Sequence, residues 1–504
     1  METKVMDYKP ELVRDKLVEV FKKRKGEATA ADLVALTGLP KPQIDLELKA
    51  VSDEYGARLK VTESGELLYS FPEGMRSRYR GFGPSLKRFW KGFRKGAALV
   101  GTWLFKAWIM LMLVGYFALF VGLAVLAFVA SFALQASGKG GDREDRRGGS
   151  GLGGLWLTSR VFETIIRIWF YSELFKDPRD RAYERGVREE KRRNKRPLHK
   201  AVFSFVFGDG DPNSAYDEVE KKAIVAFIQA NKGIMTMPEF LALTGLPPLE
   251  AEERINRYLV EFEGSPEVSQ EGGIYYFFPS LLRRADKRDR SFGGASPLKR
   301  LGAFSANPKK LNKWFVAINA ANILFGSYFL WGALTIGMPV LVNGTFRIPS
   351  GFGFFYTFTT AIFSNFLVAN SLPLVTWGLG VVPLAFSAFF YAIPALRSRR
   401  LARENEALRV DNLRKIAYRA VLDAPEALRP EAIPATLDEA KPRDAKAAEK
   451  ILVTLAAHSG GVPTEGGAYS YPEIARTQAE AAKARAAVRE SDYELGASVF
   501  DSHA

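Results

Sequence analysis

The order of apolar and polar positions in the first eighty residues predicts a small α+β module. Apolar side chains recur at helical spacing in three stretches, and two short strand-like runs follow them. The predicted elements are helices over residues 11–24, 30–36 and 41–55 and strands over residues 58–62 and 66–71. Gly65 lies in the turn between the strands. Three helices followed by a hairpin are typical of a winged helix, so we predict a winged-helix-like module over residues 1–80.

The same pattern returns 207 residues later in the chain. The stretch Ala35-Leu36-Thr37-Gly38-Leu39-Pro40 recurs as residues 242–247. The other matches at this offset are Val61 with Val268, Gly65 with Gly272, Tyr69 with Tyr276, and Phe71-Pro72 with Phe278-Pro279. A constant offset that preserves a helix-ending turn, a hairpin glycine and a terminal Phe-Pro indicates internal duplication. We therefore predict a second winged-helix-like module over residues 214–285.

A long uncharged run separates the two modules. Ala107–Leu134 is twenty-eight residues without a charge, whereas a helix needs only about 20 residues to cross a bilayer. We predict one transmembrane helix within residues 97–134, with Trp103 and Trp108 near the lipid headgroups. Residues 135–154 are glycine-rich and predict a flexible loop.

A second apolar region follows the second module. Residues 314–396 contain one charge, Arg347, and predict at least two transmembrane helices. These are Trp314–Leu341 and Leu372–Leu396. The stretch Asn343–Asn370 between them then forms an external or re-entrant element.

The formal net charge of +15 is concentrated beside the apolar regions. The basic segments are Glu73–Lys95 at +7, Lys176–Lys200 at +6 and Leu281–Lys313 at +8. Basic flanks mark the cytoplasmic side of a membrane and attract anionic headgroups. They place both modules in the cytosol, on a multi-pass protein of the cytoplasmic (inner) membrane. The chain must then cross the membrane a second time before Lys176, and residues 155–175 form either this return helix or an amphipathic helix at the interface.

The composition excludes several kinds of chemistry. The chain has no cysteine and three scattered histidines, His199, His458 and His503. Disulfides, thiolate metal sites and cysteine nucleophiles are therefore excluded, and a histidine-based site is not expected. The sequence contains no P-loop, zincin helix, serine elbow or paired-carboxylate motif. We therefore predict a protein that is not an enzyme and holds no cofactor.

One acidic stretch, which begins in the basic linker over residues 176–213, matches part of a calcium-loop spacing. Positions 1, 3, 5, 9 and 12 of that spacing are Asp209, Asp211, Asn213, Asp217 and Glu220. Position 6 is Ser214 instead of glycine, and Pro212 interrupts the loop. The preferred interpretation is a tight turn in which Asn213 or Ser214 caps the following helix. Calcium binding is the alternative.

The third helix of a winged helix often enters DNA, which requires basic residues. Here Lys41–Tyr55 has a net charge of −2 and Pro248–Glu263 a net charge of −3. Acidic helices repel a duplex, so nucleic acid is not the expected partner. We predict instead that the third helices and the wings bind a protein. The candidate contact residues are Glu47, Lys49, Arg254 and Arg257.

The remaining residues, 397–504, form a predicted cytosolic tail. A charged amphipathic helix over residues 402–422 is followed by a proline-rich linker over residues 423–441. Further on, Gly467-Ala468-Tyr469-Ser470-Tyr471-Pro472 is similar to Tyr69-Ser70-Phe71-Pro72. This similarity predicts the wing of a degenerate third module.

Two stretches are distinctive enough to suggest a family. They are Phe203–Asn213, with its Gly-Asp-Gly-Asp-Pro-Asn turn, and the segment from Gly264 to Pro279. In them the chain resembles a largely uncharacterised membrane protein family of cyanobacteria, plant chloroplasts and some other bacteria. The resemblance covers most of residues 11–400 and implies paired soluble modules and C-terminal membrane helices, without catalytic residues. Plastid members carry an iron–sulfur-assembly label, but a chain without cysteine could at most recruit other proteins to that task.

These patterns together predict a mixed fold, with tandem winged-helix-like α+β modules attached to an α-helical transmembrane region. The predicted function is to scaffold or recruit a protein partner at the membrane, and the chain could also form homo-oligomers. A membrane-tethered DNA-binding regulator is the alternative, and a small-solute transporter built on residues 314–396 is a second one. Asn319 and Asn322 lie in that region, where we expect them to hydrogen-bond between helices.

Overall fold

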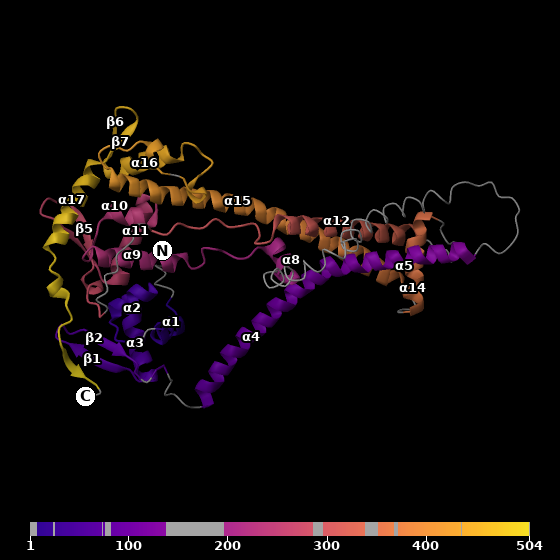
Figure 1. Cartoon of the computed structure of the whole chain (residues 1–504), viewed down its shortest axis with the longest axis horizontal. Helices are drawn as coiled ribbons and strands as arrows, with labels where there is room; N and C mark the ends of the chain where they lie inside the picture. Colours follow the sequence, from indigo (N-terminus) through magenta and orange to yellow (C-terminus); the bar gives the residue numbers. More distant parts are fainter. Residues whose placement is uncertain are drawn as a thin grey trace, which may run out of the picture. The chain divides into compact units, whose positions relative to one another are not determined.

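The computed structural model shows a mostly helical chain with small antiparallel sheets (Figure 1). The structure describes residues 8–23, 26–72, 74–75, 82–137, 196–285, 296–337, 351–366, 371–434 and 436–502. The chain divides into two compact units, the first with residues 1–91, 211–302 and 402–504, and the second with residues 92–210 and 303–401. The predicted helix 155–175 lies outside the described residues, as do most of the predicted loop 135–154 and much of the linker 176–213.

The first module opens the first unit. Its elements are α1 (Pro10–Lys23), α2 (Ala30–Thr37), α3 (Lys41–Tyr55), β1 (Arg58–Thr62) and β2 (Leu67–Ser70). Thr29 forms a capping box with Asp32 at the start of α2, and Gly38 ends this helix with a φ of 68°. Glycine adopts that left-handed conformation without steric cost. In the hairpin, Leu59 lies opposite Tyr69.

The second module has the same order of elements. They are α9 (Tyr216–Ala230), β3 (Ile234–Met235), α10 (Met237–Thr244), α11 (Pro248–Phe262), β4 (Ser265–Val268) and β5 (Ile274–Phe277). The capping box recurs as Thr236 with Glu239, and Gly245 ends α10 with a φ of 68°. Pro266 lies opposite Tyr276 in the hairpin. Both residues are 207 positions after their counterparts in the first hairpin, so the two hairpins share one register.

The tail carries a shorter version of this order, which we call the third module (residues 410–472). After the last turns of α15 (Val382–Asp423) come the short turn η6 (Pro430–Ala432), α16 (Ala447–Ser459), β6 (Val462–Thr464) and β7 (Ala468–Ser470). In its hairpin Pro463 lies opposite Tyr469. A bridge joins Tyr469 to Leu428, 41 positions earlier, just as a bridge joins Tyr69 to Ala28. The turn η6 stands where the other modules have a second α-helix.

Buried positions on the first helices also correspond. Leu413, Ala417 and Val421 lie 400 positions after Val13, Leu17 and Phe21, and all six are buried. The three modules contribute to one hydrophobic core. After the third module, the chain continues through α17 (Pro472–Ala487) and η8 (Glu490–Tyr493) to β8 (Ser498–Asp501), which joins the sheet of the first module in the order β2-β1-β8.

The modules pack head to tail through a contact that is used twice. A Cβ atom placed on Gly38 would lie 3.2 Å from the backbone oxygen of Glu218 in α9. A Cβ atom placed on Gly245 would lie 2.9 Å from the backbone oxygen of Asp411 in α15. Glu218 and Asp411 lie 207 and 400 positions after Glu11, at equivalent places in the first helices. The glycine turn of each of the first two modules therefore rests on the first helix of the next.

The described residues of the second unit form mainly apolar helices. These elements are most of α4 (Phe82–Met110), η1 (Leu111–Gly115), α5 (Tyr116–Ser137), α8 (Leu198–Phe207), α12 (Lys309–Gly332), η3 (Ala333–Gly337), η4 (Gly351–Gly353), α14 (Phe354–Phe366), η5 (Leu374–Val381) and the first part of α15. Among the described residues, three helices are long and apolar enough to cross a membrane: residues 96–132, 309–337 and 374–423. They coincide with the spans expected within residues 97–134 and 314–396. The apolar part of the third helix ends before Arg397.

Two buried asparagines link these helices. The Nδ2 atom of Asn322 donates to the backbone oxygen of Leu113 at 2.8 Å, and that of Asn319 donates to the backbone oxygen of Ser387 at 3.2 Å. Leu113 lies in η1, a π-helical turn. Its backbone hydrogen bonds span five residues instead of four, which changes which carbonyl groups are bonded within the helix. The expected role of the two asparagines in bonding between helices is confirmed.

Candidate functional site

The outer faces of the third helices carry exposed apolar side chains. The exposed positions include a set at helical spacing in each helix, with Pro42, Leu46, Lys49 and Asp53 in α3 and Leu249, Glu253, Asn256 and Val260 in α11. Leu46 is 60% exposed, Leu249 73% and Val260 63%. One exposed leucine is ordinary on a protein surface. The recurrence of such residues on the equivalent face of both helices makes these outer faces the candidate site.

Lys49 lies on the outer face of α3, as predicted for a partner-contact residue, but Glu47 does not. Glu47 is 5% exposed and accepts hydrogen bonds from the Tyr8 hydroxyl and the Arg14 guanidinium. The bond to Glu47 raises the pKa of Tyr8 above its ordinary value. One helical residue step turns the side-chain direction by about 100°, so the residue after Leu46 points into the module. Glu47 therefore holds α3 to the start of the chain and is not available to a partner.

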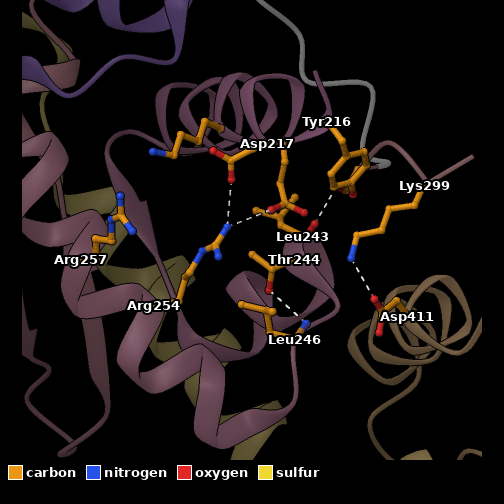
Figure 2. A network of polar contacts seen from close by, with 12 residues as sticks. Tyr216, Asp217, Leu243, Thr244, Leu246, Arg254, Arg257, Lys299 and Asp411 are labelled. Atoms are coloured by element: carbon orange, nitrogen blue, oxygen red, sulfur yellow. Dashed lines mark hydrogen bonds and ion pairs between the residues drawn. The ribbon is translucent and has the colours of Figure 1, made fainter. Parts of the chain in front are cut away.

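The two predicted arginines of α11 differ in the same way. The Arg257 side chain is 57% exposed and donates to Glu261 at 2.7 Å. Arg254 is half-buried, with its Nη2 atom 3.0 Å from Asp217 and 3.9 Å from Glu220 in α9. Figure 2 shows Arg254 directed at Asp217, with Arg257 apart from this pair. Arg257 is thus accessible to a partner, whereas Arg254 joins α11 to α9.

Behind these contacts, Lys415 closes a buried polar network between the second and third modules. Its Nζ atom is 3.0 Å from Glu220 and 3.0 Å from the Ser296 hydroxyl, and it also bonds the Tyr216 hydroxyl. Lys415 is 3% exposed, and this burial lowers its pKa while the carboxylate of Glu220 acts in the opposite direction. Beside it, Lys299 is 2.8 Å from Asp411 (Figure 2). The network is fully engaged in joining α9 to α15, so we assign it to the architecture.

The residues with calcium-loop spacing do not converge. Among the described residues, no three histidine, aspartate or glutamate side chains are grouped so that they could hold a metal ion. Asp217 and Glu220 pair with Arg254 and Lys415. Asp209 belongs to the second unit, where it accepts bonds from the Ser204 hydroxyl at 2.6 Å and from other donors. These pairings leave no common centre for calcium.

Asp209 is held in its charged form by three donors. Burial alone would raise its pKa, but bonds from Arg196, Ser204 and the backbone N–H of Ala306 bring it down to about 2.

In the first unit, Asp211 accepts the N–H of Asn213 at 2.8 Å, which forms the expected tight turn. The predicted helix cap is wrong. Ala215 caps α9 without a side-chain bond, because the Asn213 amide instead exchanges two bonds with the backbone of Arg300, each 2.8 Å long.

A small cavity lies between the start of α11 and the helices of the third module. Its volume is about 250 Å³, and its walls include Pro248, Arg414, Tyr418, Asp444 and Lys450. The charged side chains are already paired, because Arg414 donates to the backbone of Gly245 at 2.8 Å and Lys450 lies 2.7 Å from Asp444. The cavity therefore offers no charged group aimed at a ligand.

The sequence did not single out Lys415 or Asn412, although both are buried at this interface. Asn412 accepts the N–H of Lys299 at 2.9 Å and donates to its carbonyl at 2.8 Å. The sequence of this helix alone gives no reason to expect that either side chain is buried. The repeat offsets place Lys415 at the positions of Asp15 in the first module and Lys222 in the second, and neither residue indicates a buried lysine.

Comparison with known proteins adds one relative. The chain is 24% identical over 432 residues to an uncharacterised chloroplastic protein of Arabidopsis thaliana, At5g03900. The match covers 83% of this chain and 74% of the Arabidopsis protein. No family model and no solved structure matches the chain. The chain is therefore similar to an uncharacterised chloroplastic protein, and the part of it that the structure describes contains three helices long and apolar enough to cross a membrane.

Proposed function

We propose that this protein is a membrane-anchored scaffold whose winged-helix-like modules recruit a protein partner through the outer faces of their third helices. The observation that carries the proposal is the recurrence of Leu46, Leu249 and Val260 as exposed apolar side chains on those faces. Lys49 and Arg257 lie beside them and supply polar contacts at the rim. Apolar residues surrounded by polar ones are the usual make-up of a protein-binding surface.

Charge argues against the DNA-binding alternative. The outer face of α3 carries Lys49 and Asp53, and that of α11 carries Glu253. Phosphate contacts would require several cations on these faces. Arg254 adds no cation to the outer face of α11, because it is paired with Asp217 of α9. The proposal therefore assigns the helices to protein recognition.

The proposed setting is the cytoplasmic membrane, with the modules in the cytosol. Its support is the clustering of positive charge beside the apolar helices, which favours a cytosolic side rich in anionic headgroups. Arg397, Arg399, Arg400 and Arg403 follow the apolar part of the third candidate span. Fixing the modules beside lipid would raise the local concentration of a captured partner at the membrane.

Photo-crosslinking in cells tests the proposal. A benzophenone side chain is placed at Leu46, at Leu249, or at the exposed control position Lys22 near the end of α1. The proposal expects positions 46 and 249 to crosslink the same protein, and position 22 to leave it uncrosslinked. Equal crosslinking at all three positions would contradict it. Binding of the whole protein in nanodiscs to duplex DNA at low salt, weakened by Lys49→Glu and Arg257→Glu, would favour the regulator instead.

A further inference from the structure

The C-terminal strand of the chain covers the outer edge of β1. Lys60 lies opposite Asp501 and Val61 opposite Phe500, with a bulge before Thr62. The pairing extends beyond β8, because the N–H of Glu63 donates to the backbone oxygen of Ala497 at 2.9 Å. Figure 1 shows β8, in yellow at the C-terminus, beside the indigo hairpin of the first module. Segments more than 400 positions apart in the sequence thus form one sheet.

The equivalent strands of the other modules are closed to such pairing by proline. Leu59, Pro266 and Pro463 each lie opposite the tyrosine that recurs in the three hairpins, as Tyr69, Tyr276 and Tyr469. Proline has no N–H to donate and is a common device for protecting a sheet edge. Only Leu59 among these three keeps an N–H, and it donates to the Ser502 hydroxyl at 2.9 Å while the Leu59 carbonyl accepts the Ser502 N–H at 2.9 Å. The first module therefore has an edge that accepts a strand.

Two basic side chains on the outer edge of β1 interact with a carboxylate of the tail. The Arg58 Nε atom lies 2.8 Å and 3.0 Å from the two oxygens of Asp501, and its Nη2 atom also bonds Asp501. Lys60 is 4.0 Å from the same carboxylate. By contrast, Val499 is 70% exposed and Phe500 58% exposed. The tail is thus held by main-chain bonds, by bonds of the Ser64 and Ser502 hydroxyls and by the pairing of Asp501 with Arg58 and Lys60, with little apolar burial to retain it.

We propose that the outer edge of β1 is a docking site for an extended peptide of a partner protein that places a carboxylate opposite Arg58 and Lys60. The tail of this chain, which has the sequence Ser498-Val499-Phe500-Asp501, occupies the site until such a peptide displaces it. Strand addition of this kind takes its affinity from the backbone and its specificity from a few side chains. The surface is separate from the outer faces of the third helices, so either site can fail its test without affecting the other.

The test compares two forms of the protein in nanodiscs, the full chain and a chain that lacks residues 495–504. Each is titrated against a fluorescent peptide with the sequence of residues 495–502. Fluorescence anisotropy should show saturable binding to the shortened chain and at least tenfold weaker binding to the full chain, whose own tail competes. Leu59→Pro in the shortened chain should abolish binding. This variant copies Pro266 and Pro463, which the other hairpins tolerate, and retained exchange protection of β2 amides would show that its hairpin is intact.

A charge swap provides the second arm. Arg58→Glu should weaken binding at least tenfold, and a peptide carrying Asp501→Lys should restore it. Peptide binding unchanged by Leu59→Pro, or no binding to the shortened chain, would overturn the proposal. A dimer of the full chain that disappears with either the shortened tail or Leu59→Pro would also overturn it, because the occupant would then be a second copy.

Discussion

The head-to-tail contact predicts that two glycine substitutions with the same backbone strain will have different costs. Gly245 and Gly65 both have positive φ, 68° and 78°. A Cβ atom on Gly65 would meet nothing within 4 Å, whereas on Gly245 it would lie 2.9 Å from the Asp411 oxygen and closer still to the Lys415 side chain. Alanine at Gly65 therefore tests strain alone, and alanine at Gly245 tests strain together with the module contact.

The magnitudes follow from these two contributions. Left-handed backbone costs an alanine about 1–2 kcal/mol. Overpacking against a neighbour that cannot move away adds roughly 1–3 kcal/mol, and the Asp411 oxygen is part of a helix backbone. We expect Gly65→Ala to lower the free energy of local opening by about 1–2 kcal/mol and Gly245→Ala by about 2–5 kcal/mol. Gly38→Ala should fall between them, because its nearest atom is 3.2 Å away.

Hydrogen exchange measured by mass spectrometry on the whole protein in nanodiscs can separate these outcomes. In Gly245→Ala, the amides of α10 and of the last turns of α15 should lose protection together, because the contact joins them. In Gly65→Ala, the loss should stay within the β1–β2 hairpin. The reasoning is refuted if Gly245→Ala leaves α15 fully protected, or if both variants open the two modules equally.

Three further predictions concern polar groups. Lys415→Met or Glu220→Gln should each cost about 3–5 kcal/mol in urea unfolding, since each strands a buried charge, and the double variant should cost less than the sum. The pKa of Asp209 is about 2 instead of its ordinary 3.8, so its stabilisation is present above about pH 4 and is lost as the pH falls through about 2. Asp209→Asn should remove that step from the acid unfolding curve. Asn322→Leu should lower the thermal stability of the apolar unit by about 0.6–2 kcal/mol by removing the bond to Leu113, and an unchanged melting temperature would count against that bond.

Much of the repeat could be predicted because its helix starts and ends depend on residues that are close together in the sequence. Gly38 and Gly245 end helices by their own backbone conformation, and the Thr29 and Thr236 capping boxes need only residues three positions away. Apolar runs predict membrane helices for the same reason, since length and composition suffice. The first two modules and the three apolar helices thus required no knowledge of tertiary contacts.

Residues that could face a partner were harder to predict, because the burial of a side chain depends on what its helix packs against. Glu47 and Lys49 are two positions apart in one acidic helix, yet Glu47 is buried against Arg14 while Lys49 is exposed. Arg254 was expected to face a partner, but its ion pair with Asp217 forms across 37 positions of sequence. The strand β8 is harder still. Nothing within residues 498–501 indicates that they pair with β1. The offset of 207 already places Pro266 at the position of Leu59, but the match with Pro463 appears only in the hairpin registers.

The central claim is that the repeated modules lie together in the cytosol with their third-helix faces accessible. Because the chain has no cysteine, single cysteines at the matched exposed positions Lys49 and Asn256 can report on this directly. The control is Gly149→Cys in the predicted flexible loop 135–154, which follows the predicted membrane helix and would lie on the other side of the membrane. A membrane-impermeant maleimide is applied to intact cells and then to lysed cells. The account predicts that positions 49 and 256 label only after lysis and position 149 labels before it. Labelling of position 49 or 256 in intact cells would contradict the account.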